Sequence, residues 1–185
     1  MSVQNCVVQL RYIGPMFEVL VYVYENYWQG AACPEAPQLG RKLSAAGFEA
    51  EEIEAALSWL DGLQLAAQHL RPASQASKGQ ADQVVHAVHA VLTQSADSLR
   101  VYSVAEREHL GADALGFLVF LEAAGVLPPH MREIAIDRAM AAPGEPLLLD
   151  DLKIIVLMVY WSFGEEPDAL VLDELCDDST DRLAH

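Results

Sequence analysis

The sequence predicts a mainly α-helical protein, a compact helical bundle made of an N-terminal three-helix unit and a C-terminal helical unit. Apolar residues recur at helical spacing in several separated segments, and glycine or proline stands where these segments end. The length of 185 residues suits about one domain with a substantial core, and the hydrophobic content of 52% excludes a wholly disordered chain. We therefore expect the two units to share or abut one core.

Residues 16–28, MFEVLVYVYENYW, predict the first helix. Polar residues recur at helical spacing on one face and apolar residues lie opposite, namely Glu18, Tyr22, Glu25 and Gln29 against Phe17, Leu20, Val21, Tyr24 and Trp28. The alternating valines and tyrosines of 21–24 leave a strand as the alternative, but the seven-residue interval between the glutamates favours a helix. The segment is shorter than the roughly 20 apolar residues of a membrane span.

Residues 38–63 predict two more helices, which meet at Gly47. This glycine suits a left-handed C-cap, and Phe48 can fold back on the helix just ended, whose inward side chains are Leu39 and Leu43. The helix that follows has an apolar and a polar face, formed by Ile53, Ala56, Leu57 and Leu60 and by Glu51, Glu52, Glu54, Ser58 and Asp61. With the first helix these segments complete a three-helix unit over residues 16–66.

Three interpretations of this unit stay open. In a helix-turn-helix the second helix of the pair enters the major groove, but residues 49–61 contain acidic residues and no basic one, so this helix would repel DNA. The order of Leu, Gly-Phe and Ala-Leu also resembles the small ubiquitin-associated fold, which binds proteins through its Gly-Phe loop. The simplest interpretation is that Phe48 fills the corner between two helices.

Residues 67–83, rich in Ala, Ser, Gln, Gly and Pro, predict a flexible linker before the C-terminal unit of residues 84–175. This unit is expected to begin with a helix over 84–92 that carries His86 and His89. Two histidines three residues apart can face one metal ion, but spacing fixes no third strong ligand and the chain lacks HExxH and Cys/His finger patterns. We therefore assign no metal-binding residue.

The next predicted helix begins after a short extended segment at 99–102. Ser103 and Glu106 have the spacing of a capping box, and Gly111 ends the helix that they start. The residues after Gly111 predict a separate buried helix over 112–124. Two short helices are therefore expected in this part of the chain.

The buried helix over 112–124 is expected to stop at Gly125. Its Glu122 could have a raised pKa and act as a general acid, or lie at an exposed edge, and the second interpretation is favoured. Pro128 and Pro129 suit the start of another helix, which runs to a turn at 143–144.

The last strongly apolar segment predicts a deeply buried helix over 154–163. Before it, 146–149 can form a brief strand that pairs with 99–102. Paired Asp150 and Asp151 suggest a metal or acid–base site, but carboxylates at a helix start also complement the helix dipole, and no glycine-rich phosphate loop stands nearby. We favour Asp150 or Asp151 as the N-cap of the buried helix.

Charge favours a basic partner over nucleic acid. The chain has 27 acidic and 11 basic residues and a net charge of -16, and the basic residues are scattered, so direct nucleic-acid binding is not expected. Residues 164–185 contain eight acidic residues and one basic residue, a net charge of -7. Within them, 170–175 can dock a last helix, and 176–185 are expected to form a loose acidic tail.

The cysteines favour a reducing compartment. Cys6, Cys33 and Cys176 form no CxxC pair, and their odd number and wide separation do not suit a disulfide scaffold. Only Arg11 precedes the first apolar segment, and no clear cleavage site follows it, so a secretory signal peptide is not predicted. The cytoplasm is the expected location, with no membrane association.

The order of four blocks resembles the Smg family of bacterial proteins: MFEVLVYVYENY, AAGFEAEEIEAALSWLDGL, RVYSVAEREHLGADALGFLVFLEAAGVL and LLLDDLKIIVLMVYW. The resemblance spans residues 16 to about 175. It implies a small, cytoplasmic, mainly helical protein, often encoded beside genes for DNA processing and a topoisomerase-like protein. Family members typically begin at the Met-Phe-acidic-Val-Leu segment, so residues 1–15 are expected to be an extension, packed peripherally if ordered, with Met16 as the usual start.

These observations favour a non-enzymatic interaction or adaptor protein that binds a partner with a basic surface. We find no catalytic residue, cofactor-binding residue or metal ligand to assign, because no nucleophile–base pair or phosphate loop is present. The alternative is a regulator associated with DNA processing or topology, acting through the helix-turn-helix-like unit or on a nucleic-acid enzyme. An enzyme is the third hypothesis, since an active site need not carry a known motif.

Overall fold

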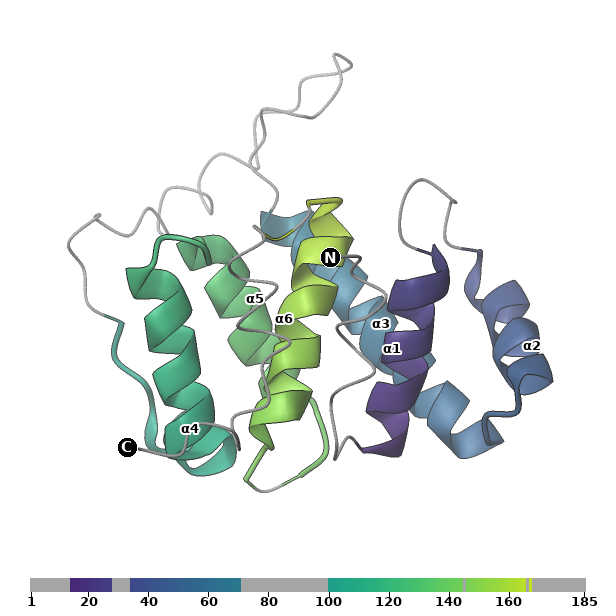
Figure 1. Cartoon of the computed structure of the whole chain (residues 1–185), viewed down its shortest axis with the longest axis horizontal. Coiled ribbons are helices and arrows are strands. Elements are labelled where there is room, and N and C mark those ends of the chain that lie inside the picture. The colour runs from purple at the N-terminus through teal and green to yellow at the C-terminus, as the bar shows by residue number, and fades with distance from the viewer. Residues whose placement is uncertain (1–13, 28–33, 71–99, 145, 166, 168–185) are drawn as a thin grey trace, which may run out of the picture.

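A computed structural model describes residues 14–27, 34–70, 100–144, 146–165 and 167, and these form six α-helices (Figure 1). The helices are α1 (Pro15–Tyr27), α2 (Ala36–Ala46), α3 (Ala50–Leu70), α4 (Val104–Ala123), α5 (Pro129–Met140) and α6 (Leu149–Phe163). The mainly helical class is confirmed. Outside the described residues lie the predicted helix over 84–92 with His86 and His89, the three cysteines, and the acidic tail 176–185.

In Figure 1, α2 and α4 lie at the two ends of the molecule, and α3 runs obliquely behind α1 and α6. Two helices make the most extensive packing: α3 packs against α1, α2, α5 and α6, and α6 packs against α1, α3, α4 and α5. Buried side chains from all six helices form one continuous hydrophobic core. The three-helix unit and the described part of the C-terminal unit therefore share a core.

Helix α6 is the most deeply buried element. Its residues 151–160 are buried without interruption, so the predicted buried helix is present, but the buried stretch begins and ends three residues earlier than the predicted 154–163. Burial of each large apolar side chain contributes about 1.5–3 kcal/mol, so this helix is a major source of stability. None of the described helices combines the length and the hydropathy that crossing a bilayer requires.

The first apolar segment is a helix and not a strand. Met16, Phe17, Val19, Leu20, Val23 and Tyr24 are its buried side chains. Val21, predicted to point inward, is half-buried, and Val23 takes the inward position. The carbonyl of Gly14 accepts hydrogen bonds from the N–H groups of Phe17 and Glu18, at 2.8 and 3.2 Å, and so starts the helix.

The corner between α2 and α3 has the predicted geometry. Gly47 lies in the left-handed region with φ 104°, and its N–H donates to Ser44 O at 3.1 Å. The Phe48 ring packs edge-on against the Tyr22 ring of α1, with 5.4 Å between the ring centroids. Phe48 therefore packs half-buried in the corner between the helices, and Gly47 beside it is exposed.

The predicted linker boundary at residue 67 is wrong, because α3 continues to Leu70 and buries Ala67. Alanine has the highest helix propensity, so an alanine-rich segment suits a helix end as well as a linker. The remainder of the predicted linker, 71–83, lies outside the described residues.

The label α4 covers two helical segments that meet at a kink at Gly111, which agrees with the prediction of two helices there. The capping box at its start is confirmed: the Glu106 N–H donates to Ser103 Oγ at 3.2 Å, and the Ser103 N–H donates to Glu106 Oε2 at 2.7 Å. Gly111 has φ 71° and ψ 177°, outside the helical region, so one helical segment ends here and a second begins after a kink, as predicted. The helix ends at Ala123, beside the predicted stop at Gly125.

The predicted strand pair is not found in the described residues, where 100–102 and 146–148 have no regular structure. The Leu147 N–H instead donates to the carbonyl oxygen of His109 at 2.7 Å. This carbonyl lies next to the break at Gly111, where the helical hydrogen-bond pattern is interrupted and an acceptor becomes free. The loop before α6 therefore attaches to α4.

The predicted N-cap of α6 is also wrong. The N-cap position is Leu148, which has no side-chain capping bond, and Asp150 and Asp151 lie in the first turn. The Gly14 N–H, just before α1, donates to Asp151 Oδ1 over a long 3.4 Å. Asp151 is 5% exposed, so this carboxyl group connects two helices from inside the protein.

Candidate partner-binding groove

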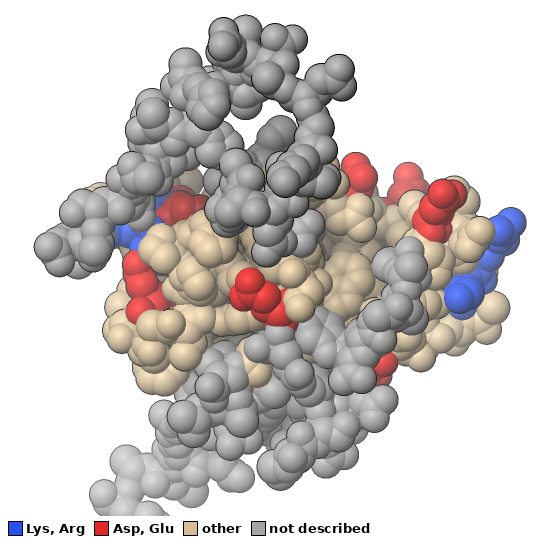
Figure 2. Space-filling view, turned by 90° about the horizontal axis from the view of Figure 1, so that it is seen from above, with Lys and Arg blue, Asp and Glu red and all other residues tan. Residues whose placement is uncertain are grey.

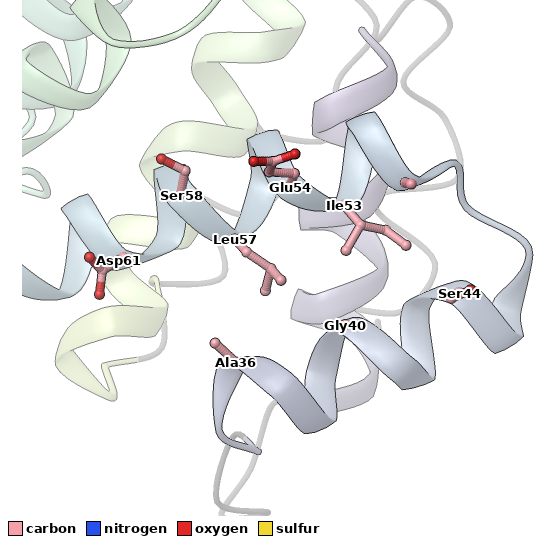
Figure 3. Close-up of a pocket in the computed structure, with 9 residues that line it drawn as sticks. Ala36, Gly40, Ser44, Ile53, Glu54, Leu57, Ser58 and Asp61 are labelled. Atoms are coloured by element: carbon pink, nitrogen blue, oxygen red, sulfur yellow. The ribbon is translucent and has the colours of Figure 1, made fainter.

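A groove lies between α2 and α3 at one end of the molecule (Figure 3). Its α2 wall consists of small residues four apart, Ala36, Gly40 and Ser44, which the 3.6-residue helical period places on one face. Leu39 and Leu43 point to the core from the adjacent face and hold α2 on α3. The short wall side chains leave an open space of about 560 Å³.

The floor of the groove is apolar and belongs to α3. Ile53 and Leu57 project from α3 toward α2, as Figure 3 shows. A Cβ atom placed on Gly40 would lie 3.5 Å from Leu57 Cδ1 and 3.9 Å from Ile53 Cγ2, which is ordinary van der Waals contact. The two helices therefore approach closely at Gly40, and the groove opens outward from this contact.

The α3 rim of the groove is acidic. Glu54 and Asp61 line it, and Glu51 continues the same exposed face one turn earlier. None of these three carboxylates forms an ion pair or a side-chain hydrogen bond with another residue in the described ranges. Their negative charge is therefore not neutralised within that part of the protein.

Acidic residues dominate this end of the molecule. Residues 34–68 contain six acidic residues and only two basic ones, the adjacent Arg41 and Lys42 on α2. Lys42 Nζ lies 5.2 Å from the centre of the Tyr27 ring, so it faces α1. In Figure 2, acidic side chains extend toward the α2 end, and basic ones occupy its tip.

The opposite end of the molecule uses its acidic residues to hold helices together. Arg100 forms paired hydrogen bonds with both carboxylate oxygens of Glu106, at 2.8 and 2.9 Å, and of Glu133, at 3.0 and 3.2 Å. Hydrogen bonding to Arg100 lowers the pKa of Glu106 to about 2, although partial burial opposes this shift. Burial also opposes ionisation of Glu133, but the hydrogen bonds from Arg100 and Arg132 outweigh it and lower the pKa.

Arg132 is the most deeply buried charged residue among those described, with 0% exposure. Its guanidinium forms ion pairs with Glu122 of α4 and with its chain neighbour Glu133. A buried guanidinium requires such partners because desolvation without them costs several kcal/mol. Glu122, considered above as a general acid, therefore has a structural partner.

Asp151 is the second carboxylate that the sequence singles out. Burial raises its pKa to about 6. The hydrogen bond from Gly14 lowers the pKa and the charge of Asp150 raises it, and both effects are smaller than that of burial. The Asp151 side chain lies at the start of α6 against the start of α1, away from the groove between α2 and α3. Its position indicates a role in joining helices.

The sequence predicted the two helices that form the groove and the acidic outer face of α3, but not the groove itself. The missed signal was local: small residues at 36, 40 and 44 share one helical face. Within the described ranges, no group of three His, Cys, Asp or Glu side chains is placed to hold a metal ion.

Comparison with known proteins gives a consistent family match. The family model described as "Protein of unknown function (DUF494)" matches residues 16–185. The chain is similar to the Protein Smg homolog of Methylibium petroleiphilum, with 59% identity over 170 residues, 92% of this chain and 100% of that protein. Proteins of the same name from Leptothrix cholodnii and Bordetella pertussis are 58% and 45% identical, again over 92% of this chain and their whole length. No solved structure matches the chain.

Proposed function

The chain belongs to the Smg family, and from that membership and the geometry of its α2–α3 end we propose that it is a non-enzymatic interaction protein that binds a partner with a basic surface. The observation that carries the proposal is the acidic rim of the groove, where Glu51, Glu54 and Asp61 have no ion-pair partner among the described residues. The negative rim can attract a basic partner, and the apolar groove beside it can then contact apolar side chains of that partner.

The negative charge of the chain favours association with a positively charged partner. A net charge of -16 repels other anions, and complementary charge accelerates association with a cationic surface. Short-range affinity then has to come from apolar contact, because exposed ion pairs contribute only about 0–1 kcal/mol each. The groove provides such contact between α2 and α3. The cytoplasm suits this interaction, because a reducing compartment would keep the three cysteines as thiols.

The second candidate is a regulator of DNA processing or topology. The feature that supports it is the helical pair α2–α3, joined by a tight turn at Gly47, because a helix-turn-helix is also built from two helices joined by a short turn. Because the outer face of α3 is acidic, the stronger form is action on a nucleic-acid enzyme and not on DNA. Proteins that bind nucleic acid present lysine and arginine to phosphates, so such an enzyme would itself be a basic partner.

The proposed function is tested by crosslinking capture from native lysate with the full chain at low and high salt. The variant Glu51→Gln/Glu54→Gln/Asp61→Asn removes three charges from the rim. We expect partners captured by the wild-type chain at low salt to be lost at high salt and with this variant, because their attraction depends on the removed charges. If the same partners were captured at high salt and by the variant, the proposal would be contradicted.

A matched variant controls for overall charge. Glu18→Gln/Glu108→Gln/Asp113→Asn removes the same three charges from exposed positions on α1 and α4. It should capture the same partners as the wild-type chain. An electrophoretic shift assay at low salt tests the direct form of the regulator, since that form requires DNA binding that weakens as salt rises.

A further inference from the structure

The size of the groove limits what can lie in it. Its volume of about 560 Å³ falls within the roughly 300–1,000 Å³ range of ligand pockets, yet it is open along α2 and α3. From Ala36 to Ser44 the α2 wall covers eight residues, about 12 Å at the α-helical rise. This length matches about two turns of another helix.

The lining of the groove specifies an apolar contact. Ile53 and Leu57 form the floor, and the polar groups that line it are the side chains of Ser44, Glu54, Ser58 and Asp61 at its margin. Leu65, one turn beyond Asp61 on the rim face of α3, is 56% exposed and extends the apolar contact past the groove. An apolar side chain gains most by leaving water on such a surface.

The rim specifies the charge that accompanies the apolar group. Glu54 and Asp61 are two turns apart on α3, so both can contact cationic groups on either side of one apolar side chain. Lysine and arginine suit these positions, because their apolar stems can lie along Leu57 while their charged ends reach the carboxylates. An acidic ligand would instead meet two unneutralised carboxylates.

The secondary structure indicates the backbone conformation of the ligand. An extended peptide usually binds by adding to the edge of a sheet, and none of the described residues lies in a strand. A helix satisfies its own backbone hydrogen bonds and can therefore enter an apolar groove without unpaired groups. From these observations we infer that the α2–α3 groove binds an amphipathic helix whose leucine-type anchor is flanked by lysine or arginine. This inference rests on the proposed function and adds the class of partner segment.

The direct test uses a fluorescein-labelled synthetic helical peptide with leucine at positions i, i+3 and i+7 and lysine on its other faces, titrated with the full chain. Anisotropy should show saturable binding that weakens as salt rises. Two matched peptides, one with glutamate in place of lysine and one with alanine in place of leucine, should each bind at least tenfold more weakly. Absence of binding by the first peptide at low salt, or equal binding of all three, would overturn the inference.

Gly40 allows the groove to be filled without altering its charge. Gly40→Leu places a side chain in the open space beside Leu57, at a helical position whose Cβ meets only ordinary contacts. We expect it to weaken binding of the lysine peptide at least tenfold. Ala45→Leu adds the same side chain to an exposed position of α2 outside the groove and should bind as the wild-type chain does. Helical circular dichroism identifies any variant that does not fold.

A second readout does not depend on any variant. Methyl NMR of the wild-type chain should show shifts of the Ile53 and Leu57 methyl groups when the lysine peptide binds. If these methyl groups stay unchanged while others shift, the groove is not the site.

The inference and the proposed function fail in different ways. If peptide binding depends on salt and on the three rim charges but Gly40→Leu binds normally, the groove inference is wrong while the basic partner stands. If Gly40→Leu abolishes binding but neutralising the rim has no effect, the groove is an apolar site and the basic partner is wrong.

Discussion

The two ends of this molecule use acidic side chains in opposite ways. At the α4–α5 end, the carboxylates of Glu106, Glu122 and Glu133 bind arginines that cross between segments. At the α2–α3 end, Glu54 and Asp61 form no ion pair with any described residue. Net charge alone therefore does not identify a binding surface. What distinguishes the groove rim is that its carboxylates, which have no ion pair with a described residue, lie beside an apolar groove.

Replacing the buried Arg132 is expected to have the largest effect on stability, and it tests whether the ion pairs at the α4–α5 end stabilise the fold. Arg132→Met keeps an unbranched side chain of similar length but leaves the partly buried Glu122 and Glu133 with less compensation. Loss of one partner of a buried ion pair costs about 3–5 kcal/mol, and because both glutamates are about one-third exposed we expect about 3 kcal/mol. Urea unfolding at neutral pH measures this loss.

Arg107→Met is the matched control for that prediction. Arg107 is exposed on α4 and has no ion pair with a described residue, so its replacement should change the free energy of unfolding by less than about 0.5 kcal/mol. Equal effects of the two substitutions would show that the Arg132 pairs do not stabilise the fold.

Glu106→Gln tests the Arg100 side of the same charge network. Glutamine retains the capping box with Ser103 but loses the charge that binds Arg100, so we expect a loss of about 2 kcal/mol at pH 7. Hydrogen bonding to Arg100 depresses the Glu106 pKa to about 2 in the folded protein, below its value in the unfolded chain. Its stabilising effect is therefore present above about pH 4.5 and is lost as the pH falls toward 2.

The measurement is urea unfolding of both proteins between pH 7 and pH 3. The difference between wild type and Glu106→Gln should narrow as the pH decreases. A difference that stays constant with pH would mean that the charge of Glu106 is not its source.

Asp151→Asn examines a buried carboxylate that lies between the two ends. Burial raises the Asp151 pKa to about 6 in the fold, so ionisation destabilises the folded state. This cost is absent below about pH 4, where the carboxyl group is protonated in both states, grows as the pH rises through 6, and is complete above it. Asparagine can still accept from Gly14, and we expect it to stabilise the protein by about 1 kcal/mol at pH 8 and not at pH 4.

Thermal unfolding of the two proteins at these pH values provides the check. If the wild-type chain were the more stable protein at pH 8, ionised Asp151 would have a compensating partner, and burial would not be the main influence on its pKa.

Local signals in the sequence predicted much of the helical framework. The Ser103–Glu106 spacing and the glycine at 47 act through backbone hydrogen bonds within a few residues, and both have the predicted geometry. The predicted N-cap of α6 is wrong because local preference alone does not place it. Its aspartates satisfy the local preference for negative charge at a helix N-terminus, whereas the partner of Asp151 is Gly14, 137 residues away.

The candidate site was predictable only in its parts. The acidic face of α3 follows from periodicity, but the use of acidic residues depends on tertiary contact. Arg100 lies 33 residues from Glu133, and no spacing rule connects them. The groove requires knowledge of how closely α2 approaches α3, which the small side chain of Gly40 permits and a sequence pattern does not measure.

Glu54→Gln is expected to have the smallest effect on stability, and it compares a rim carboxylate directly with Glu106. It is the same chemical change as Glu106→Gln, made at an exposed position with no ion pair to a described residue. We expect the free energy of unfolding to change by less than about 0.5 kcal/mol, with a slight gain because one repulsive charge near Glu51 is removed. Urea unfolding of both variants at pH 7 gives the contrast. If Glu54→Gln destabilised the chain as much as Glu106→Gln, the rim carboxylate would be part of the structural framework and its availability to a partner would be refuted.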